Sequence, residues 1–255
     1  MGALADRHAL ITGGGTGIGA AIAHVLADEG AAVSLAGRRK APLDKVAGSL
    51  RKATAIVADV TKEADCAAMV AAARAAHGPI DIVIANAGAA ASAPVAKLDL
   101  GHWDDMIDVN LTGAFLTVKA ALADLTRPSE GVRRIVFISS TAGLKGYPYV
   151  AAYCAAKHGV VGLARALSLE LAPSGVTVNA VCPGYTDTPL LDAAAEKISA
   201  KTGRSRGDSR ALLARDNPFG RLIKPEEVAR AVLRLCMPSA ASVNGEAITI
   251  TGDPE

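Results

Sequence analysis

The sequence predicts an α/β fold in which one doubly wound parallel sheet of about seven strands carries helices on both faces. Short apolar runs alternate with Ala-rich helical stretches almost to the end of the chain. These runs are apolar at consecutive positions, which is typical of parallel strands buried on both faces. No internal repeat or low-complexity segment interrupts the alternation. Residues 1–255 are therefore expected to form a single domain.

The first half of the chain is expected to supply four strands and three helices. The run HALIT at residues 8–12 is the first buried strand. Gly30 is well placed to end the first helix in the left-handed conformation. Thr61 can cap the third helix, with Glu63 near its positive end. The expected elements are strands 8–12, 31–36, 54–58 and 80–86, and helices 18–29, 41–50 and 61–77.

The second half is expected to contain two long helices and one irregular stretch. A proline and a glycine within residues 173–175 stop the second long helix, and Pro225 starts the last helix. Residues 185–220 are too many for an ordinary connection, so we expect a functional segment such as a substrate lid. The expected elements are helices 101–125, 150–172 and 225–236, and strands 132–139, 176–182 and 247–251.

Composition excludes several classes of protein. Hydrophobic residues make up 51% of the chain, too many for a disordered protein, and the net charge of +2 gives no case for nucleic-acid binding. The four cysteines show no metal-ligand spacing with the five histidines, so we expect reduced thiols and no metal. The N-terminus carries no long apolar run. We therefore expect no secretory signal, no membrane span and a cytoplasmic protein.

A glycine-rich segment, TGGGTGIG at residues 12–19, lies between the first strand and the first helix. Glycines allow a tight turn whose N–H groups approach a pyrophosphate, and the following helix offers its positive end. A helix-entry loop that needs only backbone freedom is the alternative. The position within a strand–turn–helix unit favours a Rossmann-like dinucleotide site. The residues expected to bind the cofactor here are Thr12, Gly13, Gly15, Thr16, Gly17, Ile18 and Gly19.

The end of the second strand is expected to select the cofactor. An acid there would bind the adenosine ribose and favour NAD(H), but the sequence has Arg38 and Arg39. Arg38 can hold a 2′-phosphate, so NADP(H) is expected and NAD(H) is the alternative. The two arginines could instead be a solvated surface pair.

Asp59, followed by Val60, could accept a hydrogen bond from adenine or cap the next helix. Residues 86–88, Asn86, Ala87 and Gly88, follow the fourth strand at the same sheet edge.

Tyr153 and Lys157 are candidates for the reacting group. Their spacing of four places both on one face of a helix. A phenol has a pKa near ~10, and a nearby ammonium lowers it, so Tyr153 could exchange a proton with a carbonyl or alcohol. The alternative is that Tyr153 packs in the core and that Lys157 is a solvated helix charge.

A serine pair at residues 139–140 ends the fifth strand, where this fold places ligands. Asn110 is a poor helix-interior residue, and its side chain or carbonyl could order a water that leads from Lys157 to solvent.

Together these motifs resemble the short-chain dehydrogenase/reductase family across nearly the whole chain. The resemblance implies a catalytic tetrad of Asn110, Ser140, Tyr153 and Lys157, with Ser140 rather than Ser139. It also implies that Lys157 binds the nicotinamide ribose, that Asp59 contacts adenine, and that the protein is a homotetramer. The residues that it adds to the cofactor site are Tyr153, Lys157, Pro183, Gly184, Thr186 and Thr188, of which Thr188 would contact the nicotinamide carboxamide.

The substrate is the least determined part. Within residues 197–215, six basic residues stand against one acid, Asp208. This is either a solvated helix face or a rim for the phosphates of an acyl carrier or coenzyme A. The chain resembles 3-oxoacyl-thioester reductases and 3-hydroxyacyl-CoA dehydrogenases. The alternatives are a small or cyclic ketone, alcohol or sugar as substrate, and a non-catalytic NADP(H)-sensing regulator. Gly143, Leu144, Tyr147 and Tyr149 could line the pocket or pack the loop.

Overall fold

A computed structural model describes residues 2–128 and 131–252. Seven parallel strands form one sheet in the order β3-β2-β1-β4-β5-β6-β7, which confirms the predicted doubly wound architecture. The order reverses between β1 and β4, and in such sheets ligands bind beyond the carboxyl ends of the strands at that point. The strands are β1 (His8–Thr12), β2 (Ala32–Gly37), β3 (Ala53–Val57), β4 (Ile82–Ala85), β5 (Arg134–Ile138), β6 (Thr177–Pro183) and β7 (Ala247–Ile250).

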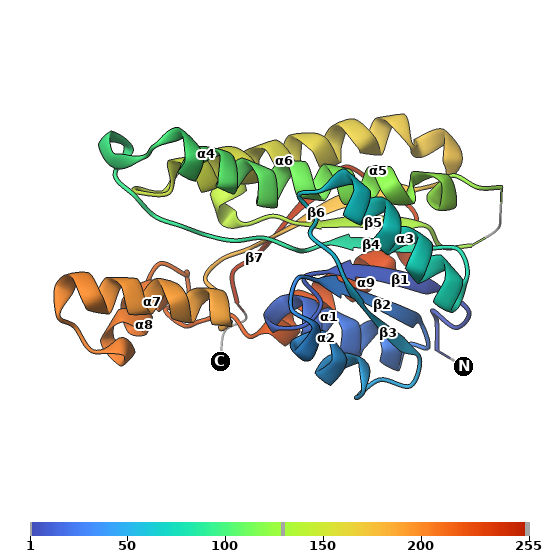
Figure 1. The fold of residues 1–255 in the computed structure, drawn as a ribbon, viewed down its shortest axis with the longest axis horizontal. Coiled ribbons are helices and arrows are strands. Elements are labelled where there is room, and N and C mark those ends of the chain that lie inside the picture. Colours follow the sequence, from blue (N-terminus) through green and yellow to red (C-terminus); the bar gives the residue numbers. More distant parts are fainter. Residues whose placement is uncertain (1, 129–130, 253–255) are drawn as a thin grey trace.

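Helices cover both faces of the sheet (Figure 1). One hydrophobic core joins the sheet to α3, α5 and α6, and a second core joins it to α1, α2 and α9. The helices are α1 (Gly17–Asp28), α2 (Lys40–Ala47), α3 (Glu63–His77), α4 (Leu100–Ile107), α5 (Gly113–Leu125), α6 (Ala151–Glu170), α7 (Pro189–Thr202), α8 (Arg206–Ala214) and α9 (Pro225–Cys236).

Burial explains the agreement between the predicted and the observed strands. Every residue of β1, β4, β5 and β6 is buried, as expected for strands covered on both sides. The edge strands β3 and β7 are only partly buried, and Val57 of β3 is 57% exposed. The expected boundaries are within two residues of the observed ones for most elements, because the apolar runs and the sheet coincide.

The long helix expected over residues 101–125 is interrupted. A π turn, Asp108–Thr112, separates α4 from α5 and contains the buried Asn110. The Asn110 side chain donates to the carbonyls of Met106 and Ala89, both at 2.9 Å. Such side chains compete with regular helical bonding, and single π turns are frequent at functional sites. The expectation of one continuous helix was therefore wrong at the residue that the sequence had marked as unusual.

The expected irregular stretch at residues 185–220 contains two helices, α7 and α8, which extend from the body of the molecule (Figure 1). Thr188 caps α7 and Ser205 caps α8, and Gly203 between them is left-handed with φ of 72°. Leu191, Ala195 and Leu213 form a small core of their own. The sequence missed these helices because their apolar face is short and interrupted by charges.

One described helical run, Leu100–Leu125, is long and apolar enough by length and composition alone to cross a membrane. The sequence predicts no membrane span, and a single helix of this kind is weak evidence for one. The run contains the π turn, and α5 within it contributes Leu116, Val118 and Leu125 to the core under the sheet. A core helix of a folded sheet passes the same test.

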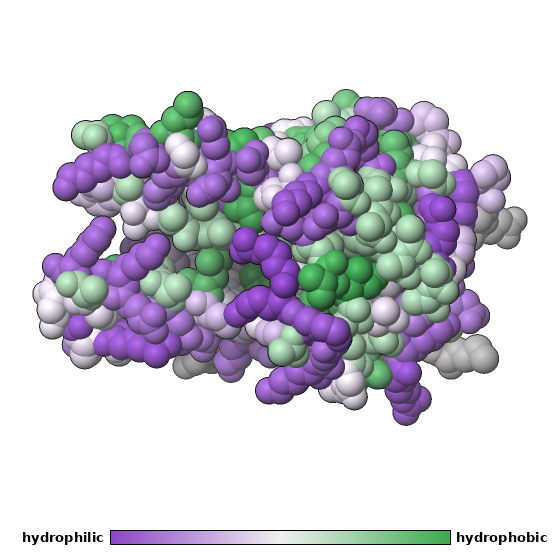
Figure 2. All heavy atoms as spheres, in the orientation of Figure 1, coloured by the Kyte–Doolittle hydropathy of each residue, from purple (hydrophilic) through white to green (hydrophobic). Residues whose placement is uncertain are grey.

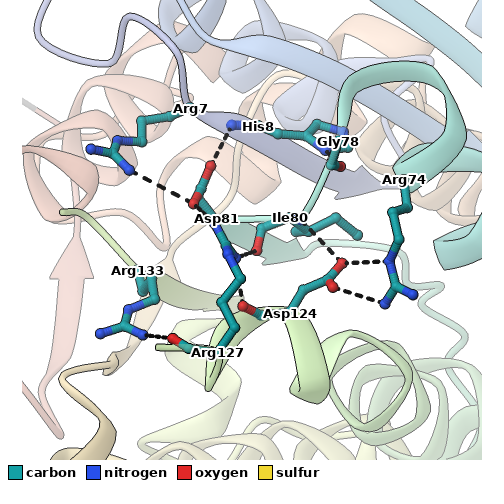
Figure 3. A network of polar contacts seen from close by, with 9 residues as sticks. All are labelled: Arg7, His8, Arg74, Gly78, Ile80, Asp81, Asp124, Arg127 and Arg133. Carbon is teal, nitrogen blue, oxygen red and sulfur yellow. Dashed lines mark hydrogen bonds and ion pairs between the residues drawn. The ribbon is translucent and has the colours of Figure 1, made fainter. Parts of the chain in front are cut away.

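Charged residues link the elements at the amino ends of the strands (Figure 3). Asp81 accepts from the backbone N–H of His8 at 2.9 Å and forms an ion pair with Arg127. Asp124 pairs with Arg74 at 2.8 Å. These contacts join β1, β4, α3 and α5 at the end of the sheet opposite to the strand ends where ligands bind in this fold.

Candidate active site

A cavity of about 1110 Å³ lies beyond the carboxyl ends of the strands. Figure 2 shows the surface hollowed between α7–α8 and the layer that contains α4 and α6. This volume is at the upper end for ligand pockets and suits a large cofactor together with a substrate. Most predicted site residues line it: Gly13, Thr16, Gly17, Ile18, Arg38, Arg39, Asp59, Val60, Asn86, Ala87, Gly88, Asn110, Ser140, Tyr153, Lys157, Pro183, Gly184, Thr186 and Thr188.

Three predicted residues, Thr12, Gly15 and Gly19, do not line the cavity but shape its wall. The Thr12 hydroxyl accepts from the backbone N–H groups of Asn86 and Ala87, both at 3.1 Å. A Cβ atom on Gly19 would lie 2.3 Å from the carbonyl oxygen of Gly13, and one on Gly15 would lie 3.1 Å from the backbone nitrogen of Leu43. These residues therefore allow the close packing of the turn on its neighbours.

The glycine-rich turn leaves a helix end facing the cavity. Gly13 and Gly17 have φ of 66° and 54°, a conformation that other residues rarely adopt. Helix α1 begins at Gly17 with Thr16 as N-cap, and no side chain caps it and no acid lies in its first turn. Its first N–H groups are thus free to bind an anion.

Arg38 and Arg39 follow β2 on the cavity wall. Both residues are exposed, and neither guanidinium group has an ion-pair or hydrogen-bond partner within residues 2–128 and 131–252. Asp59 accepts from the Thr61 backbone N–H at 3.1 Å and from its hydroxyl at 2.9 Å. These bonds, and secondarily Arg38, hold the pKa of Asp59 below its usual value. Thr61 serves this turn and is not the helix cap expected, because α3 begins at Glu63.

Lys157 and Tyr153 lie at the centre of the cavity. The Lys157 ammonium donates to the carbonyl of Ile138 at 2.9 Å and lies 5.6 Å from the centroid of the Tyr153 ring. Burial lowers the pKa of Lys157 to about 8. Burial raises the pKa of Tyr153 to about 12, and the Ser140 side chain acts in the opposite direction. The expectation that the lysine lowers the pKa of the phenol is wrong in this structure, because desolvation by burial raises that pKa.

The two serines at the end of β5 have different partners. The Ser139 hydroxyl donates to the Lys157 carbonyl at 3.0 Å and so holds helix α6 against the strand. The Ser140 hydroxyl accepts from Ala142 N–H at 3.1 Å and contacts the carbonyl of Pro183 at 3.4 Å. The Ser140 side chain also interacts with the phenol of Tyr153, whereas the Ser139 hydroxyl is bound to α6.

The basic residues of segment 185–220 divide into two groups. Arg206 pairs with Asp192 at 3.2 Å and Glu196 at 3.5 Å, and Arg210 pairs with Asp192 and with Asp187 at 2.6 Å. These three acids precede residues 197–215, the range in which the sequence contains a single acid, Asp208. The expected rim of arginines is therefore neutralised in part. Lys197 and Lys201 are the basic residues of this segment that line the main cavity, and Arg204 lines a separate pocket of about 280 Å³.

Comparison with known proteins decides the family. Residues 7–199 match the model of the short chain dehydrogenases. The chain belongs to this family. A cis-4-hydroxycyclohexanecarboxylate dehydrogenase from Sinomonas cyclohexanicum is 40% identical over 255 residues, covering 98% of this chain and 97% of that protein. A D-beta-hydroxybutyrate dehydrogenase from Rhizobium meliloti is 36% identical over 258 residues, covering 96% and 97%.

A solved structure of a variant actinorhodin polyketide ketoreductase with NADPH superposes with a TM-score of 0.91. It is 38% identical and covers 96% of each chain. The family identification and the fold class are thus confirmed. This short chain dehydrogenase is an oxidoreductase with one α/β sheet.

All four tyrosines of the dehydrogenase line the cavity, although the chain has only 3% aromatic residues. Tyr147 and Tyr149 lie in the wall, whereas Gly143 and Leu144 do not. Tyr185 also lines the cavity but was not among the residues predicted from the sequence. Its ring meets that of Tyr147 edge-on, with 6.3 Å between the ring centroids. Its place directly after the strand-end glycine, in an aromatic-poor chain, was the available signal.

Among the described residues, no group of three or more His, Cys, Asp or Glu side chains is arranged to hold a metal ion. The four cysteines of the dehydrogenase are free thiols. Burial raises the pKa values of Cys66, Cys182 and Cys236, which makes these thiols poor nucleophiles.

Proposed function

We propose that this protein transfers a hydride between NADP(H) and a carbonyl/secondary-alcohol pair, with a 3-oxoacyl or 3-hydroxyacyl thioester as the substrate. The observation that carries this is the placement of Ser140, Tyr153 and Lys157 in the same cavity as the uncapped end of α1. A proton donor and a phosphate-binding helix end then serve one reaction.

The cavity fits a dinucleotide. The free N–H groups at the start of α1 suit the pyrophosphate, and Gly13 and Gly17 leave room for it. Gly88 keeps the wall open beside Lys157. The remaining residues proposed to hold the cofactor are Thr16, Ile18, Asp59, Val60, Asn86, Ala87, Tyr153, Lys157, Pro183, Gly184, Thr186 and Thr188, with Thr12, Gly15 and Gly19 supporting the turn.

Arg38 and Arg39 support NADP(H) over NAD(H). Within the described part of the chain, both guanidinium groups at the end of β2 are unpaired, and the one acid in the cavity wall, Asp59, is engaged with Thr61. A charge-assisted hydrogen bond to a phosphate contributes roughly 1.5–3 kcal/mol, enough for a tenfold preference. The related polyketide ketoreductase was solved with NADPH, which agrees with this assignment.

In the reducing direction, the bound nicotinamide would supply the hydride. The neutral phenol of Tyr153 would donate its proton to the substrate oxygen, since its raised pKa keeps it protonated at neutral pH. The Ser140 hydroxyl would hold the same oxygen, and the Lys157 ammonium would stabilise the phenolate that remains. Each of these groups lines the cavity.

Asn110 would support the return of the proton. Its side-chain NH2 group donates to the carbonyls of Ala89 and Met106, and its Oδ1 accepts from the Ala89 N–H, so of the two groups that the sequence suggested, side chain or carbonyl, the carbonyl is favoured to order the water. We therefore assign that role to a backbone carbonyl of the π turn. The side chain would position this turn beside Lys157.

A cyclic ketone is the second candidate substrate. Tyr147 and Tyr185 form an aromatic wall that suits a ring, and the relative from Sinomonas cyclohexanicum is named for a cyclic acid. A non-catalytic NADP(H) sensor is the candidate of another class. The presence of the whole tetrad in one cavity argues against it, because a sensor needs no proton donor.

The test is to titrate the purified protein with NADPH and NADH and then to assay reduction of acetoacetyl-CoA and of cyclohexanone. Tight NADPH binding with reduction of acetoacetyl-CoA is the expected result. Preference for cyclohexanone would move the assignment to cyclic ketones. NADPH binding without turnover of any ketone would favour the sensor.

We also propose a lid over the cavity, a homotetrameric assembly and a cytoplasmic location. Residues 185–220 would act as the lid, because α7 and Leu213 of α8 line the cavity. Phe115 on α5 and Leu169 on α6 are 43% and 79% exposed, which supports a homotetramer built on these helices. The free thiols support a cytoplasmic location. Light scattering of the purified protein tests the homotetramer, and cell fractionation tests the location.

A further inference from the structure

The charged residues on the cavity wall are strongly unbalanced. Five cationic side chains line the cavity, and among the described residues Asp59 is the one acid that does so. Arg38 and Arg39 lie at the end of β2 and Lys157 at the catalytic centre. The remaining two, Lys197 and Lys201, lie on α7 and have no role in cofactor binding or proton transfer.

One face of α7 forms the lid wall of the cavity, and its character changes along the helix. Leu190, Ala193 and Ala194 line the first turns, and Lys197 and Lys201 line the later ones. Residues spaced by three and four share a helix face, so this is a continuous strip. At about 1.5 Å per residue, Lys197 lies roughly 13 Å along the axis from Thr188.

The two lysines also differ from the neighbouring arginines in their partners. Arg206 and Arg210 are held by Asp187, Asp192 and Glu196. The side chains of Lys197 and Lys201 form no ion pair or hydrogen bond with any residue in 2–128 or 131–252, and both residues are exposed. Their charges are thus available to a ligand in the cavity.

We propose that Lys197 and Lys201 form an anion subsite that selects substrates with an apolar stretch between the reacting carbonyl and a carboxylate or phosphate. This rests on the proposed ketone reduction at Tyr153. The apolar first turns of α7 would pack against the stretch, and the lysines would bind the anion by charge-assisted hydrogen bonds. A free acid and the phosphates of a thioester carrier are the two sources of such an anion.

Matched substrate pairs separate the anion from the rest of the molecule. One pair is 7-oxooctanoate and its methyl ester, which tests a carboxylate. The other is acetoacetyl-CoA and the neutral acetoacetyl N-acetylcysteamine thioester, which tests phosphate. Steady-state rates with NADPH are compared for the wild type, Lys197→Gln, Lys201→Gln and the double variant. Arg204→Gln is the matched control, because Arg204 is basic, in the same segment and outside the main cavity.

The expected result is a rise in KM for the anionic member of a pair by roughly fivefold for each lysine removed, with kcat little changed. The KM for the neutral member should stay at the wild-type value in every variant. Arg204→Gln should have the wild-type KM for both members. The pair that responds identifies the source of the anion. Added salt should raise the KM of the anionic member in the wild type and have little effect in the double variant.

Equal changes for both members of each pair, or no change at all, would overturn the subsite. An equal effect of Arg204→Gln would also overturn it, since the lid would then act as a diffuse positive field. If the wild type reduces none of the ketones, the proposed function fails, and calorimetry decides the subsite separately. The subsite is supported if 7-oxooctanoate binds to the NADPH complex, its methyl ester does not, and the double variant loses this binding. Equal binding of the acid and the ester would overturn the subsite.

Discussion

The side chain of Asn110 occupies the space that a methyl group on Gly88 would need. A Cβ atom on Gly88 would lie 2.7 Å from Oδ1 of Asn110 and 3.6 Å from Nζ of Lys157. The turn after β4 and the π turn between α4 and α5 are thus in direct contact beside Lys157.

Gly88→Ala should impair catalysis more than stability. The added methyl group would push Asn110 away from Ala89 and disturb the surroundings of Lys157. Because small misplacements at a reacting centre are costly, we expect kcat to fall by roughly 10- to 100-fold. Steady-state kinetics and a thermal melt check this. Gly162→Ala on α6 is the control, since nothing lies within 4 Å of its added Cβ. Wild-type kcat in folded Gly88→Ala would show that this contact is not needed.

Arg38→Glu should reverse the cofactor preference. The carboxylate would repel a 2′-phosphate and accept from the ribose hydroxyls instead. We expect the Kd for NADPH to rise by about tenfold or more while the Kd for NADH falls or stays the same. Fluorescence titration with both nucleotides measures this, and Arg39→Gln measures the share of the neighbouring guanidinium group. An unchanged NADPH affinity would make Arg38 a solvated surface charge.

Tyr153→Phe should retain the cofactor and lose turnover. The change removes the proton donor but little volume, so the cavity keeps its shape. We expect NADPH affinity within about twofold of the wild type and a loss of kcat of at least 100-fold, the range for general acid catalysis. Binding and kinetics on the same preparation test this. Comparable turnover in the variant would exclude Tyr153 as the proton donor.

The reduction rate should fall at alkaline pH. Burial lowers the pKa of Lys157 to about 8, so the ammonium loses its proton as the pH rises through that value. The positive charge that would stabilise the Tyr153 phenolate then disappears. We expect kcat for ketone reduction to be flat near pH 7 and to decline above about pH 8. A kcat that stays constant to pH 10 would contradict this role of the ammonium.

His8 should make the fold less stable in acid. Its ring nitrogens bond to the Gly78 carbonyl and the Ser34 hydroxyl, both at 2.8 Å, and burial lowers its pKa. Below the unfolded pKa near ~6.5 the unfolded chain binds the proton more readily, so stability falls as the pH falls. One such group changes the free energy of unfolding by at most about 1.4 kcal/mol per pH unit.

Denaturant unfolding at pH 7.5 and pH 5.5 measures this effect. His8→Gln should be less stable than the wild type at pH 7.5 and show a smaller loss at pH 5.5. His77→Gln is the control, because burial lowers the pKa of His77 as well and its contribution must be separated. An identical loss in His8→Gln and the wild type would assign the acid sensitivity to other groups.

The sequence was most informative where a residue's environment follows from its neighbours in the chain. Consecutive apolar residues predicted β1 and β6 because both faces of these strands are covered. Pro225 and the acids after it predicted the start of α9 at the correct residue. The glycine turn and the pair Tyr153 and Lys157 are also local patterns, and they lie where the fold places ligands.

Features that depend on distant contacts were missed or only half seen. The π turn arises because Asn110 bonds to Ala89, 21 residues away. The pairing of Arg210 with Asp187 spans 23 residues, so a count of charges within one window could not show it. The raised pKa of Tyr153 reflects burial by several elements, which the spacing to Lys157 alone does not reveal.

The two ends of the strands face different demands when the sequence changes. At the amino ends, Asp81 and Asp124 are bound to arginines and to backbone N–H groups, so loss of one partner leaves a buried charge unsatisfied. At the carboxyl ends, Lys197 and Arg38 contact no other described side chain by an ion pair or hydrogen bond. Substitutions there alter what enters the cavity and cost the fold little. New substrate preferences can therefore evolve at one end of the sheet while the other end keeps the protein folded.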